Sequence, residues 1–441
     1  MISPARACAF DVVRRVFEQG AYADRAFTSR AAALDARERA FAMQLTYGTV
    51  QRRATLDHVA QRLCTRPLAE LDPPVLAALR LGLFQLLLLG GVAEHAAVNE
   101  SVELVKGAGG AGLVNAVLRR SAHEGSAILG ALDDAAPAGA AIKHSVPQWL
   151  AERWWSERGG PEALALLRTV NDPAESALRV NTLRESPAAV LARLPVPARP
   201  APGLPEGIVL GGAFDAHGSP LWRAGAIMPQ SRASMLVSRV LDPRPGERVL
   251  DLCAAPGGKT THLAALMGDA GEIVAVELHR GRADALRQTC SRMGTACIEV
   301  QLGNASAFRA RAPFDRVLVD PPCSGLGTLG SRPDLRWRAG PAEIDAMAAR
   351  QAAILAAGAR ATRAGGVLVY SVCTISRAES EDVVEGFLRS HREFTAQDLG
   401  SDHPPWGAAG AGRPGGVGPY LQLLPHRDRT DGFFVAALRR A

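Results

Sequence analysis

Two cysteines in similar settings are the residues of this sequence best suited to chemistry. The stretch "DRVLVDPPCSG" leads from an apolar run into Asp320 and Cys323, and "GGVLVYSVCTI" leads from another apolar run into Cys373. A thiol beside positive charge or a helix N-terminus loses its proton more readily and becomes a nucleophile. Buried cysteine is more often just a small apolar residue. That structural interpretation suffices for Cys8, Cys64, Cys290 and Cys297.

The elements that would position these thiols form a repeating pattern after about residue 240. Apolar runs that predict strands alternate with helical stretches, at 248–253, 272–278, 297–302, 315–320, 366–373 and 432–440. Near-continuous apolar strands separated by helices are typical of a parallel sheet covered on both faces. Ligands of such sheets bind beyond the carboxyl ends of the strands. Cys253, Asp320, Cys323 and Cys373 all lie at those ends, which predicts a site there.

A turn of small residues follows the first of these strands. In "VLDLCAAPGGKTT", two glycines precede a helix predicted from Lys259 to Met267, so backbone N–H groups can approach a ligand. The spacing is neither GxGxxG nor that of a phosphate-binding P-loop. The next strand ends near Glu277, about 20 residues later, where an acidic residue can accept both ribose hydroxyls. The alternatives are an ordinary strand–helix turn, a surface carboxylate at Glu277 and a turn-capping Asp320.

Composition limits the class of protein. A chain of 441 residues, 47% hydrophobic and 21% charged, predicts a folded protein of two or three domains. The net charge is +6, and 47 of the 50 cationic residues are arginine. Genome bias can explain that preference by itself, although arginine also suits phosphate and favours a nucleic-acid partner. The seven cysteines form no CxxC pair, so neither a disulfide framework nor a metal site is expected.

The sequence predicts neither export nor a membrane span. The N-terminus, "MISPARACAFDVVRRVFEQG", carries charges where a signal peptide needs an apolar core, so a cytoplasmic protein is expected. The apolar segment 75–93 is interrupted by Arg80, Gln85 and two glycines, which favours a buried helix. Residues 1–120 show a helical period and predict four to seven helices, whereas 121–145, rich in Ala, Gly and Ser, predict a linker.

These motifs together resemble a known family. "DLCAAPGGKT", "DPPCSGLGTLGSRPDLRW" and "LVYSVCTI" resemble the RNA cytosine-5 methyltransferases, and "LDARERAFAMQLTYGTVQRRATLDHV" and "GLVNAVLRR" resemble the NusB-like RNA-binding domain. "LRVNTLR" resembles the small module that precedes the catalytic domain. The order is that of the bacterial 16S ribosomal RNA cytosine-5 methyltransferase B (RsmB/Sun) family, over almost the whole chain. The resemblance implies a multidomain fold: an all-α NusB-like domain (1–130), a small α+β bridging module (146–222) and an α/β Rossmann-like methyltransferase domain (223–441).

The resemblance also implies the roles of the site residues. Cys373 corresponds to the nucleophile, Cys323 to the cysteine that aids product release, and Asp320 to the acid at the N3 edge of the cytosine. The implied cofactor is S-adenosyl-L-methionine. Its binding residues would be Cys253, Ala254, Ala255, Pro256, Gly257, Gly258, Lys259, Glu277, Arg282, Asn304 and Asp320. Two of these depart from the family pattern, since Glu277 and Asn304 stand where the family usually has Asp.

The implied partner is RNA, and two alternatives remain beside the leading one. The leading hypothesis is methylation of one cytosine of 16S ribosomal RNA before or during subunit assembly, by a monomer. One alternative keeps the chemistry and takes transfer RNA or another ribosomal site. The other is a non-catalytic RNA-binding or antitermination factor, which only Asn304 favours. An amino-group methyltransferase is disfavoured, because its PPY or PPW turn would place an aromatic ring at Cys323.

Overall fold

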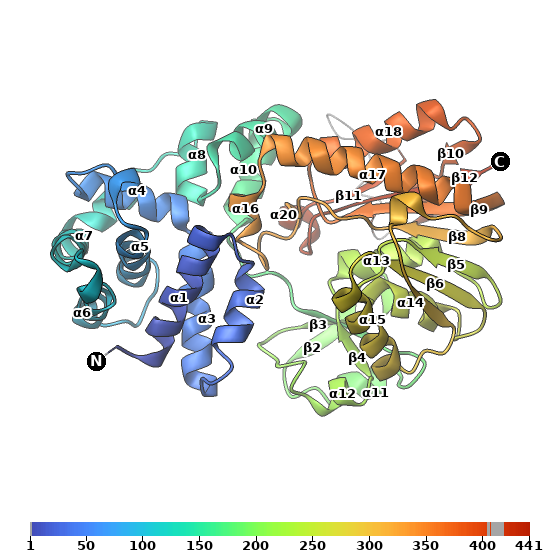
Figure 1. Ribbon diagram of the computed structural model, residues 1–441, viewed down its shortest axis with the longest axis horizontal. Helices are drawn as coiled ribbons and strands as arrows, with labels where there is room; N and C mark the ends of the chain where they lie inside the picture. Colours follow the sequence, from blue (N-terminus) through green and yellow to red (C-terminus); the bar gives the residue numbers. More distant parts are fainter. Residues whose placement is uncertain (1, 404–405, 407–418) are drawn as a thin grey trace. The chain divides into compact units, whose positions relative to one another are not determined.

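The computed structural model describes residues 2–403, 406 and 419–441, which form two compact units (Figure 1). The first comprises Met1–Asp172 and Leu329–Arg338, and is called the helical unit below. The second comprises Pro173–Thr328 and Ala339–Ala441, and is called the sheet unit. The chain therefore leaves the sheet unit shortly after Cys323, contributes ten residues to the helical unit and returns.

Helices make up the helical unit, and the first seven of these helices share one apolar core. The helices are α1 (Pro4–Gln19), α2 (Ala23–Arg30), α3 (Ala36–Gln51), α4 (Arg53–Leu63), α5 (Pro73–Leu87), α6 (Glu94–Glu103), α7 (Ala111–Gly130), α8 (Pro137–His144), α9 (Gln148–Arg158), α10 (Gly160–Thr169) and α16 (Leu335–Arg338). Seven of them lie between residues 4 and 130, as the helical period predicts. The core includes Val13, Leu45, Leu79 and Leu118, all fully buried.

The apolar segment near residue 80 is a buried helix, as its interruptions predict. α5 begins with two prolines, which the first helical turn tolerates because its N–H groups have no partner within the helix. Leu79, Leu81 and Leu83 are all inaccessible to solvent, although they lie on different sides of α5. Across the described residues, none of the helices combines the length and apolar character that crossing a bilayer demands.

The prediction of a linker at 121–145 is wrong. α7 continues to Gly130 and α8 occupies Pro137–His144, so most of this range is helical. Alanine, which dominates the segment, has the highest helix propensity of all residues. Gly125 has a packing role, because a Cβ there would lie 2.6 Å from Cδ2 of Leu87 on α5. The small residues thus let two helices approach each other.

The excursion Leu329–Arg338 is built into the helical unit by Arg336. This side chain is fully buried, and it donates hydrogen bonds to Ser145 O at 2.9 Å, Asn171 Oδ1 at 2.8 Å and Val170 O at 3.2 Å. Burial lowers the pKa of Arg336 to about 9. Trp337 adds a hydrogen bond from its indole N–H to Val50 O at 2.7 Å. The excursion is therefore part of the packed interior of the unit.

Replacement of Arg336 by alanine should destabilise the helical unit strongly. Arg336→Ala leaves several buried acceptors without a donor, and it opens a cavity, so we expect a loss of roughly 3 kcal/mol or more in unfolding free energy. Urea unfolding of the full chain measures this change in unfolding free energy. Arg119→Ala is the control, because Arg119 is exposed and bonds only to Asn115 within α7. Equal stability of the two variants would contradict this account of Arg336.

The sheet unit contains a small antiparallel sheet near its start. Its strand order is β2 (Ala198–Ala201), β3 (Leu204–Leu210), β1 (Ala177–Val180) and β4 (Ile227–Pro229). The short helices α11 (Pro187–Ala192) and α12 (Pro220–Arg223) both begin at proline. The many prolines between 187 and 220 thus keep regular elements short, as expected. Leu178, Ile208 and Ile227 form part of its core.

The large sheet of this unit has the order β10-β12-β9-β8-β5-β6-β7, with β11 paired to β12. Its strands are β5 (Arg248–Asp251), β6 (Glu272–Glu277), β7 (Ile298–Leu302), β8 (Phe314–Val319), β9 (Thr362–Val372), β10 (Phe394–Ala396), β11 (Leu421–Leu423) and β12 (Phe433–Arg440). Strands β5 to β9 pair in parallel, as predicted. β12 is antiparallel to β9, which the apolar pattern alone did not reveal.

Helices cover both faces of this sheet (Figure 1). The covering helices are α13 (Arg232–Leu241), α14 (Gly258–Leu266), α15 (Arg280–Met293), α17 (Pro341–Ala361) and α18 (Glu381–Ser390). Alternate residues of each strand enter different cores. Val249 and Leu318 pack with Leu236 of α13 and Leu263 of α14. Leu250 and Val317, on the opposite face, pack with Leu355 of α17 and Val384 of α18.

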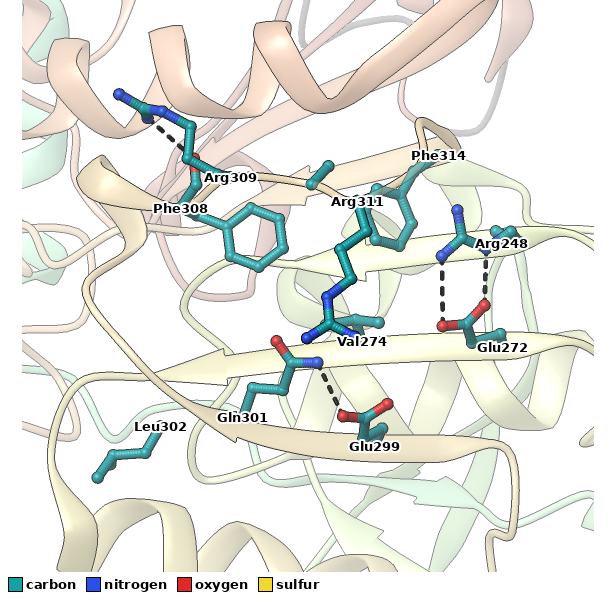
Figure 2. A pocket seen from close by; sticks show the side chains of 11 residues that line it. Arg248, Glu272, Val274, Glu299, Gln301, Leu302, Phe308, Arg309, Arg311 and Phe314 are labelled. Carbon is teal, nitrogen blue, oxygen red and sulfur yellow. Dashed lines mark hydrogen bonds and ion pairs between the residues drawn. The ribbon is translucent and has the colours of Figure 1, made fainter.

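A hollow of about 520 Å³ lies away from the expected site (Figure 2). Its walls include Arg248, Glu272 and Phe314, the first residues of three strands, and the loop 308–311. Arg248 and Glu272 form an ion pair at 2.6 Å across it. Since the cysteines lie at the carboxyl ends of the strands, this hollow is separate from them.

Candidate functional site

The parallel pairing of β8 with β9 brings the two cysteines together. Val319 of β8 pairs with Tyr370 of β9 near the ends of the two strands, and the polypeptide turns after each strand. The sulfur atoms of Cys323 and Cys373 lie 3.3 Å apart, within hydrogen-bonding distance for thiols. Both side chains are partly buried, so the pair retains access to solvent.

The pKa values of the two thiols are shifted in opposite directions. The hydrogen bond from the Cys323 thiol lowers the pKa of Cys373 against burial and the negative charge of Asp320, and the Lys259 ammonium lowers it further. The same hydrogen bond, together with burial, raises the pKa of Cys323 well above its usual range. Cys373 is therefore the sulfur that ionises first, and Cys323 remains a thiol that donates to it.

Lys259 and Asp320 form an ion pair beside the sulfurs. Lys259 Nζ lies 2.7 Å from Asp320 Oδ2, and Ser371 Oγ donates to Asp320 Oδ1 at 2.7 Å. Burial lowers the pKa of Lys259, but the charge of Asp320 and its hydrogen bond outweigh burial, so the pKa lies above its usual value. Lys259 thus stays cationic, and the orientation of the Asp320 carboxylate is fixed by two donors.

The turn after β5 has the close approach that its small residues predict. Gly257 has φ of 103°, and a Cβ there would lie 2.7 Å from Leu286. Ala254 N donates to Val276 O at 3.1 Å, which ties the turn to β6. The N-terminus of α14 begins at Gly258, so the turn and the helix start offer N–H groups to one ligand.

Sequence reasoning missed Asp251, the last residue of β5. Its buried carboxylate accepts from Thr260 Oγ1 at 2.8 Å, which fixes α14 to the strand end. Burial raises the pKa of Asp251 to about 6. One sequence feature could have identified Asp251: it is a lone acidic residue inside the apolar run "RVLDLC". A strand that is buried on both faces does not by itself explain an acidic residue there.

Glu277 and Arg282 lie on the other side of this turn. Arg282 Nη2 donates to Ala255 O at 2.8 Å and lies 3.5 Å from Glu277 Oε2. Glu277 Oε1 accepts from His279 N at 2.9 Å. Arg282 therefore contacts the turn and the acidic residue together, and orients both.

Asn304 lies at the end of β7, next to β6. Gly303 N donates to Glu277 O at 2.9 Å, which brings the following Asn304 beside the acidic position. Asn304 Oδ1 accepts from Ser306 N at 3.1 Å and Ser306 Oγ at 2.9 Å. The side-chain oxygen of Asn304 therefore caps the short helix η3 (Ala305–Ala307).

The structure thus brings the expected residues into two adjoining groups. Cys373, Cys323, Asp320 and Lys259 form one, and the turn 253–258 with Glu277, Arg282 and Asn304 forms the other. Lys259 lies at the start of α14, directly after this turn, and contacts Asp320, so it joins the two groups. In the part of the chain that the structure describes, no three His, Cys, Asp or Glu side chains are grouped as a metal site would require.

Comparisons with known families identify this α/β unit as a methyltransferase domain. Residues 238–439 match the family described as 16S rRNA methyltransferase RsmB/F. Residues 3–123 match the NusB family, and residues 146–217 match the ferredoxin-like domain of RsmF/B-like methyltransferases. The three matches confirm the expected fold class: a helical NusB-like domain, a small α+β module and an α/β methyltransferase domain.

Similar proteins extend over nearly the whole chain. The ribosomal RNA small subunit methyltransferase B of Thermus thermophilus is 37% identical over 92% of this chain and 89% of its own. That of Xanthomonas campestris is 32% identical over 99% and 97%. The crystal structure of a protein named PH0851 is 28% identical, with a TM-score of 0.80 over 100% of this chain and 99% of its own. The chain belongs to the RsmB/F family of 16S rRNA methyltransferases, which confirms the family predicted from its motifs and that the protein is an rRNA methyltransferase.

Removal of the charge at Lys259 should make Cys373 less reactive. We expect Cys373 of the unmodified protein to react with iodoacetamide faster than Cys323 at pH 7. Lys259→Gln removes the cation that lowers the pKa of Cys373, so the alkylation rate should fall, about tenfold for each unit of pKa. Mass spectrometry of the peptides that contain Cys323 and Cys373 measures the two alkylation rates. Lys259→Arg retains the charge and should react much like the unmodified protein; equal rates in the Gln variant would contradict the electrostatic role.

Proposed function

We propose that this rRNA methyltransferase methylates carbon 5 of one cytosine in 16S rRNA through a transient covalent bond between Cys373 and carbon 6 of the ring. The observation that carries the proposal is the sulfur pair, 3.3 Å apart, with Lys259 beside it. C5 of cytosine is a poor nucleophile. Addition of the Cys373 thiolate to C6 converts the ring into an enamine whose C5 can attack a methyl group.

Asp320 orients the cytosine during the addition. Ser371 and Lys259 fix its carboxylate, which lies just after β8 at the sulfur pair. A carboxyl group in this position can hold or protonate the N3 edge of the ring and so stabilise the electron density that arrives there. Two fixed donors reduce the reorganisation that this step requires.

Cys323 completes the reaction. After methyl transfer, the C5 proton must leave so that the Cys373–C6 bond can break and restore the aromatic ring. Once Cys373 is bonded to carbon it has no negative charge, so the strongest cause of the raised pKa of Cys323 disappears. Cys323 can then give its proton to water and, as a thiolate, take the proton from C5. The electrons of the C5–H bond form the ring double bond, and the Cys373–C6 bond breaks to release Cys373 as a thiolate. The proposed division of roles therefore follows from which sulfur ionises first.

The second group of residues fits S-adenosyl-L-methionine, which supplies an electrophilic methyl group when bound. The turn Cys253, Ala254, Ala255, Pro256, Gly257, Gly258 and Lys259 would hold its amino-acid part, because Gly257 lets the backbone come close. Glu277 would accept the ribose hydroxyls. Asn304 would meet the adenine, and Arg282 would orient Glu277 and the turn. Asp320, bonded to Lys259, connects this group to the thiols.

The target is assigned to 16S rRNA from the family and its named members. The NusB match over 3–123 and the arginine-rich composition support RNA binding by the helical unit. The cytosine must be unpaired or flipped out of a helix to reach a thiol at the ends of strands. The proposed substrate is therefore RNA before or during subunit assembly.

Replacement of Cys323 should trap the RNA on the enzyme. Without Cys323 the final elimination stalls, so Cys323→Ala with S-adenosyl-L-methionine and 16S rRNA should accumulate a covalent adduct that survives a denaturing gel. The double variant Cys323→Ala/Cys373→Ala should show none, and Cys373→Ala should lose methylation. Cys64→Ala is the control, since Cys64 lies in the helical unit.

The same reactions with transfer RNA test the substrate. Bisulfite sequencing of product from the unmodified enzyme should show 5-methylcytosine at one position of 16S rRNA and none in transfer RNA. An adduct that persists without Cys373 would refute its role as nucleophile, and methylation of transfer RNA alone would refute the assigned substrate.

Glu277 should determine the affinity for the cofactor and should not affect the reactivity of the thiols. Glu277→Ala removes the acceptor for the ribose, and we expect weaker binding of S-adenosylhomocysteine by calorimetry, by roughly 1.5–3 kcal/mol for hydrogen bonds to a charged group. Alkylation of Cys373 should be unchanged. Glu299→Ala, at an exposed residue of β7, is the control. Unaltered binding in the Glu277 variant would contradict the assigned ribose contact.

A further inference from the structure

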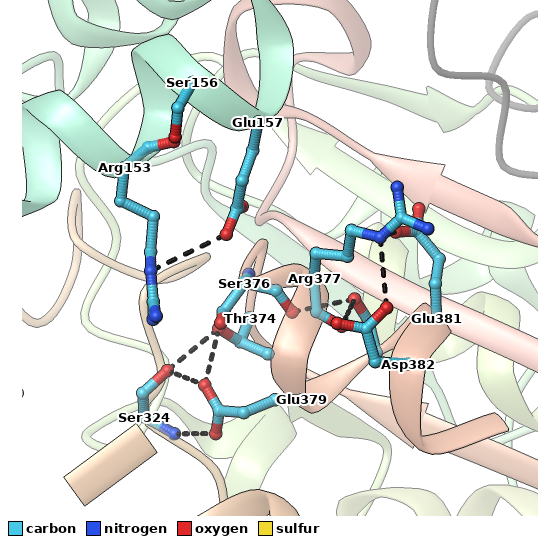
Figure 3. Close-up of polar contacts among 11 residues, drawn as sticks. Arg153, Ser156, Glu157, Ser324, Thr374, Ser376, Arg377, Glu379, Glu381 and Asp382 are labelled. Carbon is cyan, nitrogen blue, oxygen red and sulfur yellow. Dashed lines mark hydrogen bonds and ion pairs between the residues drawn. The ribbon is translucent and has the colours of Figure 1, made fainter. Parts of the chain in front are cut away.

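A buried carboxylate behind the sulfur pair has no role in the reaction described above. Glu379 ends the short helix η4 (Arg377–Glu379), six residues after Cys373, and its side chain is fully buried. A buried carboxylate is costly unless donors surround it. Figure 3 shows two of its partners, Ser324 and Thr374, each of which directly follows one of the cysteines in the sequence.

Glu379 contacts the Cys323 loop through Ser324. Ser324 N donates to Glu379 Oε1 at 2.8 Å, and Ser324 Oγ donates to Glu379 Oε2. Gln351 of α17 reinforces this contact, since its Nε2 donates to Glu379 Oε1 at 3.1 Å and to Pro322 O at 3.0 Å. The backbone is therefore held on both sides of Cys323.

The same carboxylate contacts the Cys373 loop. Thr374 Oγ1 lies 3.4 Å from Glu379 Oε2 and 2.9 Å from Ser324 Oγ. The two hydroxyl protons serve these contacts: Ser324 donates to Glu379, and Thr374 donates to Ser324 or to Glu379. Tyr370 OH donates to the backbone oxygen of Glu379 at 2.6 Å, which fixes η4 against β9.

We propose that Glu379 is a positioning residue that holds the Cys323 loop against the Cys373 loop and so sets the contact between the two sulfurs. This inference rests on the proposed function of the two cysteines. The bonds through Ser324 and Thr374 begin one residue beyond each cysteine, so a change in Glu379 is transmitted to both sulfurs at once. A misplacement of reacting groups by 1 Å can lower a rate by about a hundredfold.

The negative charge of Glu379 also acts selectively. It lies on the Cys323 side of the pair and is among the causes that raise the pKa of that thiol. It therefore helps to keep Cys323 protonated, as the donor to Cys373. Geometry and charge can be separated, because glutamine has the same shape and the hydroxyls of Ser324 and Thr374 can rotate to accept from its amide.

Three variants of the full chain test the proposal: Glu379→Ala, Glu379→Gln and, as a control, Glu385→Gln at an exposed residue of α18. With S-adenosyl-L-methionine and 16S rRNA, Glu379→Ala should lower kcat by on the order of tenfold to a hundredfold, with little change in KM for RNA. Because Cys323 is displaced, covalent adduct should also accumulate on a denaturing gel. Glu379→Gln should recover most of kcat, and Glu385→Gln should match the unmodified enzyme.

A measurement without RNA or cofactor separates this inference from the proposed function. Diamide oxidises the Cys323 and Cys373 thiols to a disulfide and is itself reduced to the hydrazine, at a rate that depends on how the sulfurs face each other. Glu379→Ala should slow formation of this disulfide several-fold, even if Cys373 proved not to be the nucleophile. Peptide mass spectrometry measures the rate. If Glu379→Ala does not fold, Ser324→Ala and Thr374→Val each remove one contact and should slow the reaction in the same direction.

Unchanged disulfide formation and unchanged kcat in Glu379→Ala, or in both hydroxyl variants, would overturn the inference. So would a loss of activity that merely parallels a loss of thermal stability, equal in the Ala and Gln variants and without adduct. Methylation by the Cys373→Ala enzyme, in contrast, would overturn the proposed function and leave the diamide result to decide the role of Glu379.

Discussion

Strand β8 pairs with β9 in parallel, and their last pair in register, Val319 with Tyr370, sets how far each chain runs before it reaches a cysteine. Parallel strands end at the same edge of a sheet, so two segments fifty residues apart deliver their sulfurs to one place. A change of register by one residue would turn each following side chain to the other face. The apolar cores on both faces of the sheet resist such a change, and in this way they maintain the contact between the thiols.

One cation serves both parts of the site. Lys259 follows the turn after β5, yet its ammonium group pairs with Asp320 at the end of β8 and lowers the pKa of Cys373. The turn that would hold the methyl donor therefore also influences the nucleophile. The two neighbouring carboxylates lie in different environments. Asp320 forms an ion pair with Lys259, whereas Asp251 is buried and accepts a hydrogen bond from Thr260.

The sequence predicted the parts of the site that depend on strand ends. Cys323, Cys373, Asp320 and Glu277 each follow or end an apolar run, and in a parallel sheet such ends converge whatever the details of packing. Glu379 was missed because its partners Ser324 and Gln351 come from distant segments. Asp251 was missed although a lone acidic residue in an apolar run marks it. The helices in 121–145 were mistaken for a linker because small residues suit both loops and close helix contacts. The antiparallel β12 was missed because an apolar run has no direction.

The excursion Leu329–Arg338 has an evolutionary consequence. Fold families often exchange an N-terminal module as one contiguous stretch of gene, but here the interior of that module includes ten residues encoded far downstream, with Arg336 fully enclosed. Recombination that grafted only residues 1–172 onto an unrelated partner would leave an empty slot lined by unsatisfied carbonyl groups. The helical unit is therefore assembled from two separate stretches of sequence, and a fragment that ends at residue 172 lacks part of its interior.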